Sequence, residues 1–201
     1  MSVAENATGI AEEDILRADL YDLLGTLLAK PPTAEVLGQL SALGGDDSEL
    51  GQSFVALARL ARQMTPQTAK SEFDTLFIGL TRGELLPYAS YYQTGFLNEK
   101  PLGLLRRDMA RLGITRAPEV FEPEDNIASL CEMMAGLIRG RFGTPAELAT
   151  QRDFFQAHLA PWAGHFFSDL EGAKNSVLYA PIGAIGRAFM EIEREAFRMG
   201  A

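Results

Sequence analysis

The chain has 201 residues, of which 47% are hydrophobic and 22% are charged. This length and composition suffice for one globular domain with a buried core. The formal net charge of −9 argues against a nucleic-acid partner, because phosphate binding requires clustered lysine and arginine. The single cysteine, Cys131, excludes an internal disulfide and fits a reducing compartment.

The N-terminal segment from Ser2 to Asp14 contains acidic residues and no lysine or arginine. A secretory signal peptide has the opposite pattern, in which a basic start precedes an apolar stretch. Charged residues such as Glu132, Arg139 and Arg187 interrupt the most apolar stretches, which therefore fall short of the roughly 20 apolar residues that span a bilayer. We predict a soluble, cytoplasmic protein without stable membrane insertion.

Apolar residues recur at steps of three and four along most of the chain, which predicts amphipathic helices. Prolines and glycines fall between these segments or at their starts, where they are tolerated. We expect about eight or nine helices and no strand. The clearest periodic segments run from Leu16 to Leu27, Leu50 to Ala61, Phe73 to Leu80, Leu102 to Leu112, Ile127 to Ile138 and Ile182 to Phe197.

Two stretches, 81–87 and 115–123, contain turn-forming residues and no sustained apolar face, which is typical of functional loops or of a hinge. A hinge would let one part of the chain pack on a second copy, so we expect a monomer or a domain-swapped dimer. We predict a single all-α domain over residues 1–201, with helical blocks at about 14–114 and 123–199 on either side of a hinge at about 115–122.

The sequence lacks the residue patterns of catalysis and of metal binding. The two histidines, His158 and His165, do not have the spacing of a zinc or di-iron site. Cys131 lies within a predicted helix, where a thiol usually packs as a small hydrophobic group. We therefore predict that the protein is not an enzyme and binds no metal or other cofactor. The alternative is a small helical enzyme whose site has no recognisable motif.

Aromatic residues are concentrated in the segment from Pro87 to Phe96. Tyrosine combines apolar area with a polar tip, which suits a recognition surface. The alternative is structural, because Tyr88 and Tyr92 would share one helix face and close the core of a bundle.

Several motifs resemble those of the TorD/DmsD/NarJ-type redox-enzyme maturation chaperones. Phe73 to Tyr92 is similar to the family signature of aromatic-x-x-Leu-Phe, glycines and Pro-Tyr-x-Ser-x-Tyr. Glu122 to Asn126 resembles Glu-Pro-x-Asp-His, Gln151 to Trp162 resembles Gln-x-x-Phe followed by His-Leu-x-Pro-Trp, and Leu20 to Leu24 fits the first helix. These four motifs occur in the family order and cover most of the chain.

One residue departs from the family pattern. Asn126 stands where the family usually has histidine; it retains hydrogen-bonding capacity but cannot titrate near neutral pH. The substitution puts in doubt any role that needs a protonated imidazole.

The resemblance implies an all-helical fold with a hinge before the Glu-Pro-x-Asp motif. It also implies a chaperone that binds the N-terminal, twin-arginine leader of a molybdenum-containing oxidoreductase. Such a chaperone holds the apoenzyme until its cofactors are inserted and it is exported. The implied partners are the leader peptide and the apo catalytic subunit. The alternative within the family is a NarJ-like assembly factor for a molybdoenzyme subunit that is not exported.

A twin-arginine leader presents two guanidinium groups and an apolar segment, so its binding site needs carboxylates and an apolar groove. The acidic residues around Pro123 fit the first need, although acidic residues at a helix start also act as caps. Trp162 and Phe77 are assigned to the core. The predicted peptide-binding residues are Glu122, Glu124, Asp125, Asn126, Tyr88, Tyr91, Tyr92 and Phe96.

Overall fold

The computed structural model describes residues 10–200, which form ten α-helices and one π-helical turn. No strand is among the elements of these residues, and an isolated β-bridge joins Tyr88 and Asn126. The predicted all-α class is therefore confirmed, with at least one helix more than expected. Of the acidic N-terminal segment, residues 2–9 lie outside the described residues, whereas Glu12 begins the first helix.

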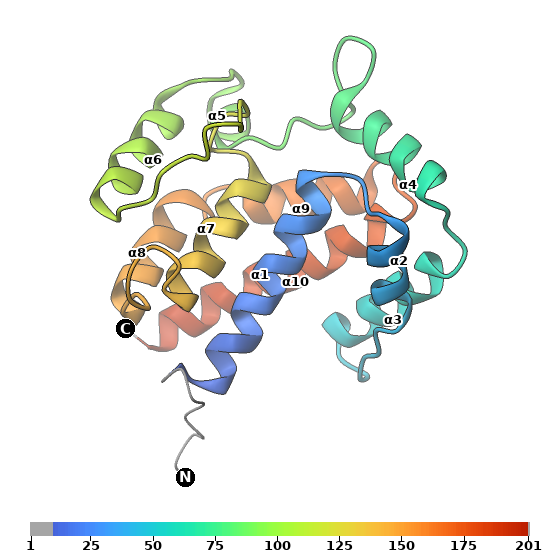
Figure 1. The fold of residues 1–201 in the computed structure, drawn as a ribbon, viewed down its shortest axis with the longest axis horizontal. Coiled ribbons are helices and arrows are strands. Elements are labelled where there is room, and N and C mark those ends of the chain that lie inside the picture. The colour runs from blue at the N-terminus through green and yellow to red at the C-terminus, as the bar shows by residue number, and fades with distance from the viewer. Residues whose placement is uncertain (1–9, 201) are drawn as a thin grey trace. The chain divides into compact units, whose positions relative to one another are not determined.

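The order of the helices along the chain is shown in Figure 1. They are α1 Glu12–Ala29, α2 Ala34–Ser41, α3 Glu49–Ala61, α4 Pro66–Phe73, the π-helical turn Asp74–Ile78, α5 Ala89–Thr94, α6 Lys100–Arg111, α7 Ile127–Arg139, α8 Leu148–His158, α9 Ala163–Gly172 and α10 Tyr179–Met199.

Side-chain caps explain where several of these helices begin. Thr33 and Ser48 accept hydrogen bonds from Val36 N (3.3 Å) and Gly51 N (3.0 Å), which satisfies one free amide at the start of α2 and of α3. Thr65 forms a capping box ahead of Pro66, the first residue of α4.

The chain forms two compact units, each built from two separate segments. Within the described residues, the first unit contains 10–29 and 88–161, and the second contains 30–87 and 162–200. The loop at 115–122 lies inside the first unit, between α6 and α7. The two units therefore divide the chain differently from the two blocks expected on either side of this loop, and its role as a hinge stays a prediction.

The first unit contains α1 and α5 to α8. Its main contact joins α1 to α7, which lie side by side (Figure 1). Both helices bury their apolar faces, including Tyr21 and Leu24 of α1 and Leu130 and Met134 of α7. This burial fixes the polar residues at the edges of the two helices, and those edges form the site described below.

The second unit contains α2 to α4, the π-helical turn, α9 and α10. Helix α10 packs mainly on α9 and α3. Two glycines of α10 allow the close approach to α9. A Cβ atom at Gly183 would lie 2.5 Å from the backbone nitrogen of Glu171, and one at Gly186 would lie 2.2 Å from the ring of Phe167.

Replacing Gly183 with alanine is expected to lower the free energy of unfolding by about 1–3 kcal/mol, because the new methyl group meets backbone and the helices must separate. Gly38 of α2 is the matched control, since a Cβ there has no neighbour within 4 Å. Gly38→Ala is expected to raise stability by about 0.5–1 kcal/mol through helix propensity. Urea unfolding of both variants tests the packing. An increase in stability for Gly183→Ala would contradict it.

The prediction of one helix is wrong in part. The periodic segment from Phe73 to Leu80 is not a single α-helix, because α4 ends at Phe73 and a π-helical turn follows to Ile78. Gly79 then adopts a positive φ of 64°, and a Cβ there would lie 2.0 Å from the carbonyl oxygen of Arg82. The chain turns at this glycine, so Leu80 is fully exposed.

Within the described residues, no helix combines the length and the apolar character needed to cross a membrane.

Candidate functional site

A cavity of about 360 Å³ lies in the first unit, bordered by α1, α7, the end of α6 and the loops that follow α6 and α7. Its lining combines apolar side chains with more carboxylates than arginines. The apolar side chains include Met109, Ile114, Val120, Met133 and Phe142, the carboxylates are Asp22, Glu122, Glu124 and Glu132, and the arginines are Arg116 and Arg141.

Glu124 lies in the cavity wall as part of an ion-paired network. Arg106 donates to its Oε2 from Nε (3.0 Å) and Nη2 (2.8 Å), and Arg116 lies 3.7 Å from Oε1. Burial raises the pKa of Glu124, but the hydrogen bond from Arg106 and the two positive charges outweigh it and hold the pKa below its ordinary value. Glu124 is therefore an ionised carboxylate that anchors the loop between α6 and α7.

Glu122 also lines the cavity and is exposed. The hydroxyl of Tyr88 donates a hydrogen bond to its Oε1. This contact places a side chain of the Pro-Tyr-x-Ser-x-Tyr motif against the Glu-Pro-x-Asp motif, 34 residues later in the sequence. Of the three predicted carboxylates, Glu122 is the one whose side chain remains accessible.

Asp125 and Asn126 are buried and have local structural contacts. Asp125 Oδ2 accepts from Ser90 N (2.8 Å), and its backbone oxygen accepts from Ala89 N (2.9 Å), so this residue fixes the start of α5. Asn126 accepts from Ala128 N (2.9 Å) and caps α7. The structure thus brings Glu122 and Glu124 to the cavity and places Asp125 and Asn126 beside α5 and α7. Peptide binding by any of the four stays a prediction.

The other predicted aromatic residues lie on or after α5. Tyr91 and Tyr92 are half-buried and contact each other edge to face, with ring centroids 6.2 Å apart. Phe96 is 70% exposed. None of the three lines the cavity. In the second unit, Trp162 is buried, as expected for a core residue. Phe77 is half-buried and packs edge-on against Phe73 and Tyr179.

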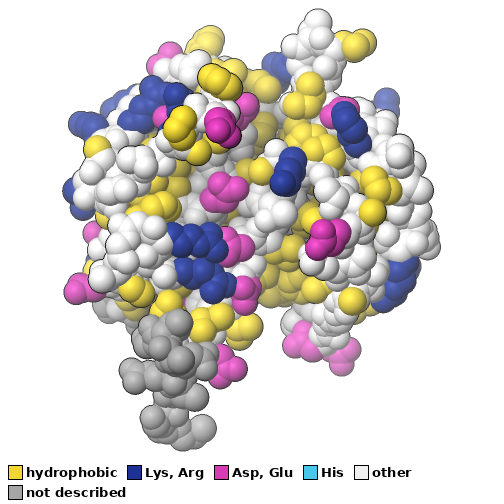
Figure 2. Space-filling view, viewed as in Figure 1, with side chains coloured by type: hydrophobic (Ala, Val, Ile, Leu, Met, Phe, Trp, Pro, Cys, Tyr) yellow, Lys and Arg dark blue, Asp and Glu magenta, His cyan; other side chains and the backbone are white. Residues whose placement is uncertain are grey.

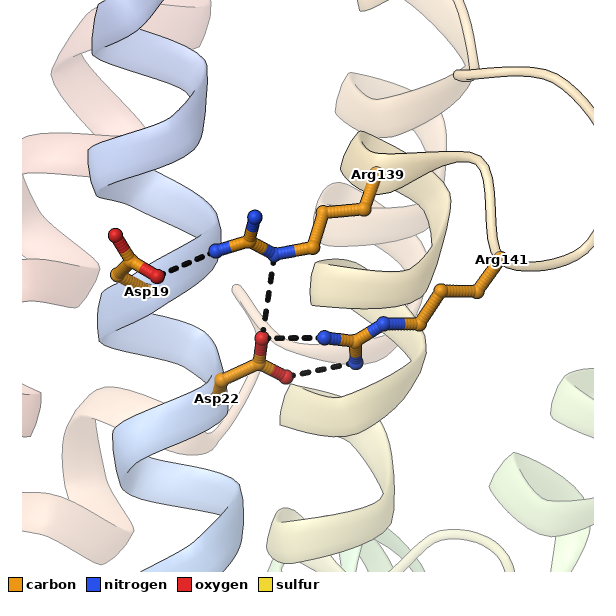
Figure 3. Close-up of polar contacts among 4 residues, drawn as sticks. All are labelled: Asp19, Asp22, Arg139 and Arg141. Carbon is orange, nitrogen blue, oxygen red and sulfur yellow. Dashed lines mark hydrogen bonds and ion pairs between the residues drawn. The ribbon is translucent and has the colours of Figure 1, made fainter. Parts of the chain in front are cut away.

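A second group of charges joins α1 to the end of α7 (Figure 3). Arg141 donates from Nη1 and Nη2 to the two carboxylate oxygens of Asp22, at 2.8 and 2.6 Å. The hydrogen bonds to Asp22 raise the pKa of Arg141 above its ordinary value, against the opposing effect of burial. Arg139 reaches Asp19 and also lies with its Nε 3.3 Å from Asp22.

Four residues that line the cavity were not predicted from the sequence as site residues, namely Asp22, Glu132, Arg141 and Phe142. Asp22 stands between apolar residues of the first predicted helix, and this pattern indicates only an amphipathic helix. On the face shown in Figure 2, basic side chains lie directly beside acidic ones over α1 and α7, with exposed hydrophobic side chains around them. A signal for the missed residues was the Arg-Gly-Arg sequence at 139–141, which places two arginines at a helix end.

Cys131 is fully buried in α7. Burial raises the pKa of its thiol, and the negative charges of Glu132 and Asp22 act in the same direction. A protonated thiol inside the core is a poor nucleophile, so Cys131 acts here as a packing residue.

The sequence model of the family described as nitrate reductase delta subunit matches residues 43–168. This match covers more than half of the chain and includes the Pro-Tyr-x-Ser-x-Tyr and Glu-Pro-x-Asp motifs, which contact each other in the structure. The chain belongs to this family of TorD/NarJ-type redox-enzyme maturation chaperones. The family resemblance inferred from the motifs is thereby confirmed.

Relatives within the TorD/NarJ family extend the similarity over nearly the whole chain. A chaperone protein TorD from Vibrio atlanticus is 28% identical over 200 residues, which cover 89% of this chain and 93% of the relative. A chaperone protein TorD from Photobacterium profundum is 32% identical over 138 residues, which cover 61% and 63% of the two chains.

The fold of this TorD/NarJ family member is similar to that of a solved structure. The crystal structure of a redox enzyme maturation protein from Archaeoglobus fulgidus aligns with a TM-score of 0.58 at 21% identity, over 94% of this chain and 99% of the other. At this identity the likeness concerns the fold, and it agrees with the all-helical architecture described above.

Proposed function

We propose that this chain binds the N-terminal leader of a molybdenum-containing oxidoreductase, a leader with two adjacent arginines. It holds the apoenzyme in the cytoplasm until the cofactor is inserted and the enzyme is exported. Membership of the TorD/NarJ family supports this function. The observation that carries it is the cavity of the first unit, in which apolar side chains and an excess of carboxylates line one space.

The cavity suits a short apolar part of a leader. Its volume of about 360 Å³ lies at the low end of the range for ligand pockets, roughly 300–1,000 Å³, so it accepts a few side chains and not a whole leader. Each large apolar side chain that leaves water for such a pocket contributes roughly 1.5–3 kcal/mol before the cost of ordering the peptide. Most of the affinity is therefore expected from apolar contacts with residues such as Val120, Met133 and Phe142.

The carboxylates supply selectivity for arginine. Arginine suits this purpose because its guanidinium group can donate two parallel hydrogen bonds to one carboxylate. A partly exposed pair contributes about 1 kcal/mol or less, so charge discriminates between leaders more than it increases affinity. We assign the direct contact to Glu122, whose side chain is exposed at the cavity. Glu124, which is buried and paired with Arg106 and Arg116, holds the loop between α6 and α7. Asp125, Asn126 and Tyr88 act by holding the loop and α5 in place.

Tyr91, Tyr92 and Phe96 are assigned to an extension of the binding surface beyond the cavity. The exposed ring of Phe96 and the half-buried tyrosines offer apolar area with polar tips. The apolar part of a leader is longer than the cavity can hold, so further contacts outside the cavity are required.

Calorimetry with two synthetic peptides tests this function. One has two adjacent arginines followed by about 10 apolar residues, and the other has glutamines in place of the arginines. We expect the arginine peptide to bind more tightly. Glu122→Gln is expected to lower the affinity for the arginine peptide by up to about fivefold and to leave the affinity for the glutamine peptide unchanged.

Glu147→Gln is the matched control, because Glu147 is exposed in the same unit and does not line the cavity. If neither peptide binds, leader binding by this chain is wrong. Equal affinity for the two peptides would instead favour the NarJ-like alternative. In that case the client subunit is not exported, and binding does not depend on a pair of arginines.

A further inference from the structure

Asp22 is a carboxylate in the cavity wall, and both of its oxygens are already bonded to a guanidinium group of the same chain. Arg141 approaches it in the bidentate geometry that is frequent in pairs of arginine with a carboxylate, with hydrogen bonds of 2.8 and 2.6 Å. Arg139, two residues earlier, reaches Asp19 and also lies beside Asp22 (Figure 3). Two arginines of one short segment thus occupy acidic groups of α1, as two leader arginines would.

We propose that Arg141 is a built-in competitor of the leader, which occupies Asp22 until a leader arginine displaces it. This inference rests on the proposed function, because it requires that an arginine-containing leader enters this cavity. It makes Arg141 a residue that limits the affinity for arginine-containing leaders, and it identifies the leader's charged end as the part that α1 contacts.

The backbone around Arg141 is fixed, so displacement concerns its side chain alone. Gly140 ends α7 in the left-handed conformation, with φ of 74°, and Arg141 N donates to Gly136 O at 2.8 Å. The ring of Phe142 lies over Gly136, where a Cβ atom would be 2.4 Å from the ring. Phe142 can therefore keep its place in the cavity wall while Arg141 turns away.

The ion pair is accessible enough to open. The side chain of Arg141 is 46% exposed and that of Asp22 is 30% exposed. Solvent competes for both groups, so the pair contributes little net stability, and a leader arginine can match it. Exchange of one arginine for another at Asp22 then leaves the number of ion pairs unchanged. For the unmodified protein, this site should add little net affinity and little salt dependence.

Removing the competitor should therefore strengthen binding. Arg141→Gln is expected to increase affinity for the arginine peptide by about threefold to fivefold at low salt, with no change for the glutamine peptide. The gain should shrink near 1 M salt, where the Debye length falls to about 3 Å. Asp22→Asn alone should bind the arginine peptide about as tightly as the unmodified protein, because it removes the acceptor from both competitors. Adding Arg141→Gln to Asp22→Asn should give no gain.

Arg107→Gln is the control for net charge, because Arg107 is exposed on α6 and does not line the cavity. Thermal unfolding of each variant checks that it is folded. If Arg141→Gln unfolds, Arg141→Lys replaces it, because lysine keeps the charge and loses the bidentate contact. Arg141→Lys should show a smaller gain in affinity for the arginine peptide.

The outcomes separate this inference from the proposed function. If the unmodified protein prefers the arginine peptide but Arg141→Gln binds it no better, the competitor role is wrong and leader binding stands. An equal gain for the glutamine peptide, or from Arg107→Gln, also overturns the competitor role. If no variant binds either peptide, the proposed function fails together with the inference.

Discussion

Replacing Glu72 with glutamine is expected to lower the free energy of unfolding by about 3 kcal/mol. Glu72 lies near the end of α4 and is buried. Its Oε1 accepts from Val177 N (2.7 Å) and Tyr179 N (2.9 Å), and its Oε2 accepts from Leu178 N (3.1 Å). One carboxylate thus satisfies three backbone amides at the start of α10, where the helix dipole also favours a negative charge.

Glutamine cannot replace this carboxylate, because its amide group would place N–H donors against backbone N–H donors. Glu84 provides a matched control in the same unit. It accepts from Lys174 N (2.6 Å), Asn175 N (3.3 Å) and Asn175 Nδ2 (2.8 Å), but it is exposed. Water replaces lost hydrogen bonds at an exposed site, so Glu84→Gln is expected to cost less than about 1 kcal/mol.

Chemical denaturation of the two variants, side by side, is the measurement. Equal losses of stability for Glu72→Gln and Glu84→Gln would show that burial of Glu72 is not what makes its contacts with α10 important.

Replacing Asp125 with alanine is expected to lower the free energy of unfolding by about 2–3 kcal/mol. Asp125 is 1% exposed, and its Oδ2 accepts from Ser90 N at 2.8 Å. Removing the acceptor leaves that amide buried without a partner at the start of α5. The loss should appear in urea unfolding and as faster amide exchange at Ser90.

Asp125→Asn separates this structural role from a charge effect. Oδ1 has no hydrogen-bond partner within the described residues, so an amide group can take its place while the other oxygen still accepts from Ser90 N. We expect Asp125→Asn to cost less than about 1 kcal/mol and to bind the two leader peptides like the unmodified protein. A selective loss of affinity for the arginine peptide would assign the Asp125 carboxylate to direct peptide binding.

Much of the helical architecture could be predicted from the local sequence, because an amphipathic helix depends on residues three or four positions apart. The segment from Ile127 to Ile138 is an example, since its apolar period predicts a helix that the structure places at Ile127–Arg139. The family motifs predicted the all-α fold class and the family itself. The prediction of one helix from Phe73 to Leu80 was wrong, because periodicity does not reveal that the chain turns at Gly79.

The sequence by itself therefore determined the all-helical class, the family and two of the acidic residues that line the candidate site. Only the tertiary structure decided which carboxylates are accessible. Asp125 is bonded to the start of α5, and Glu124 is buried and paired with Arg106 and Arg116. Glu122 lines the cavity with an exposed side chain. The pairing of Asp22 with Arg141 joins residues 119 positions apart. No local pattern encodes such a contact, because it arises only when two apolar helix faces pack and bring their polar edges together.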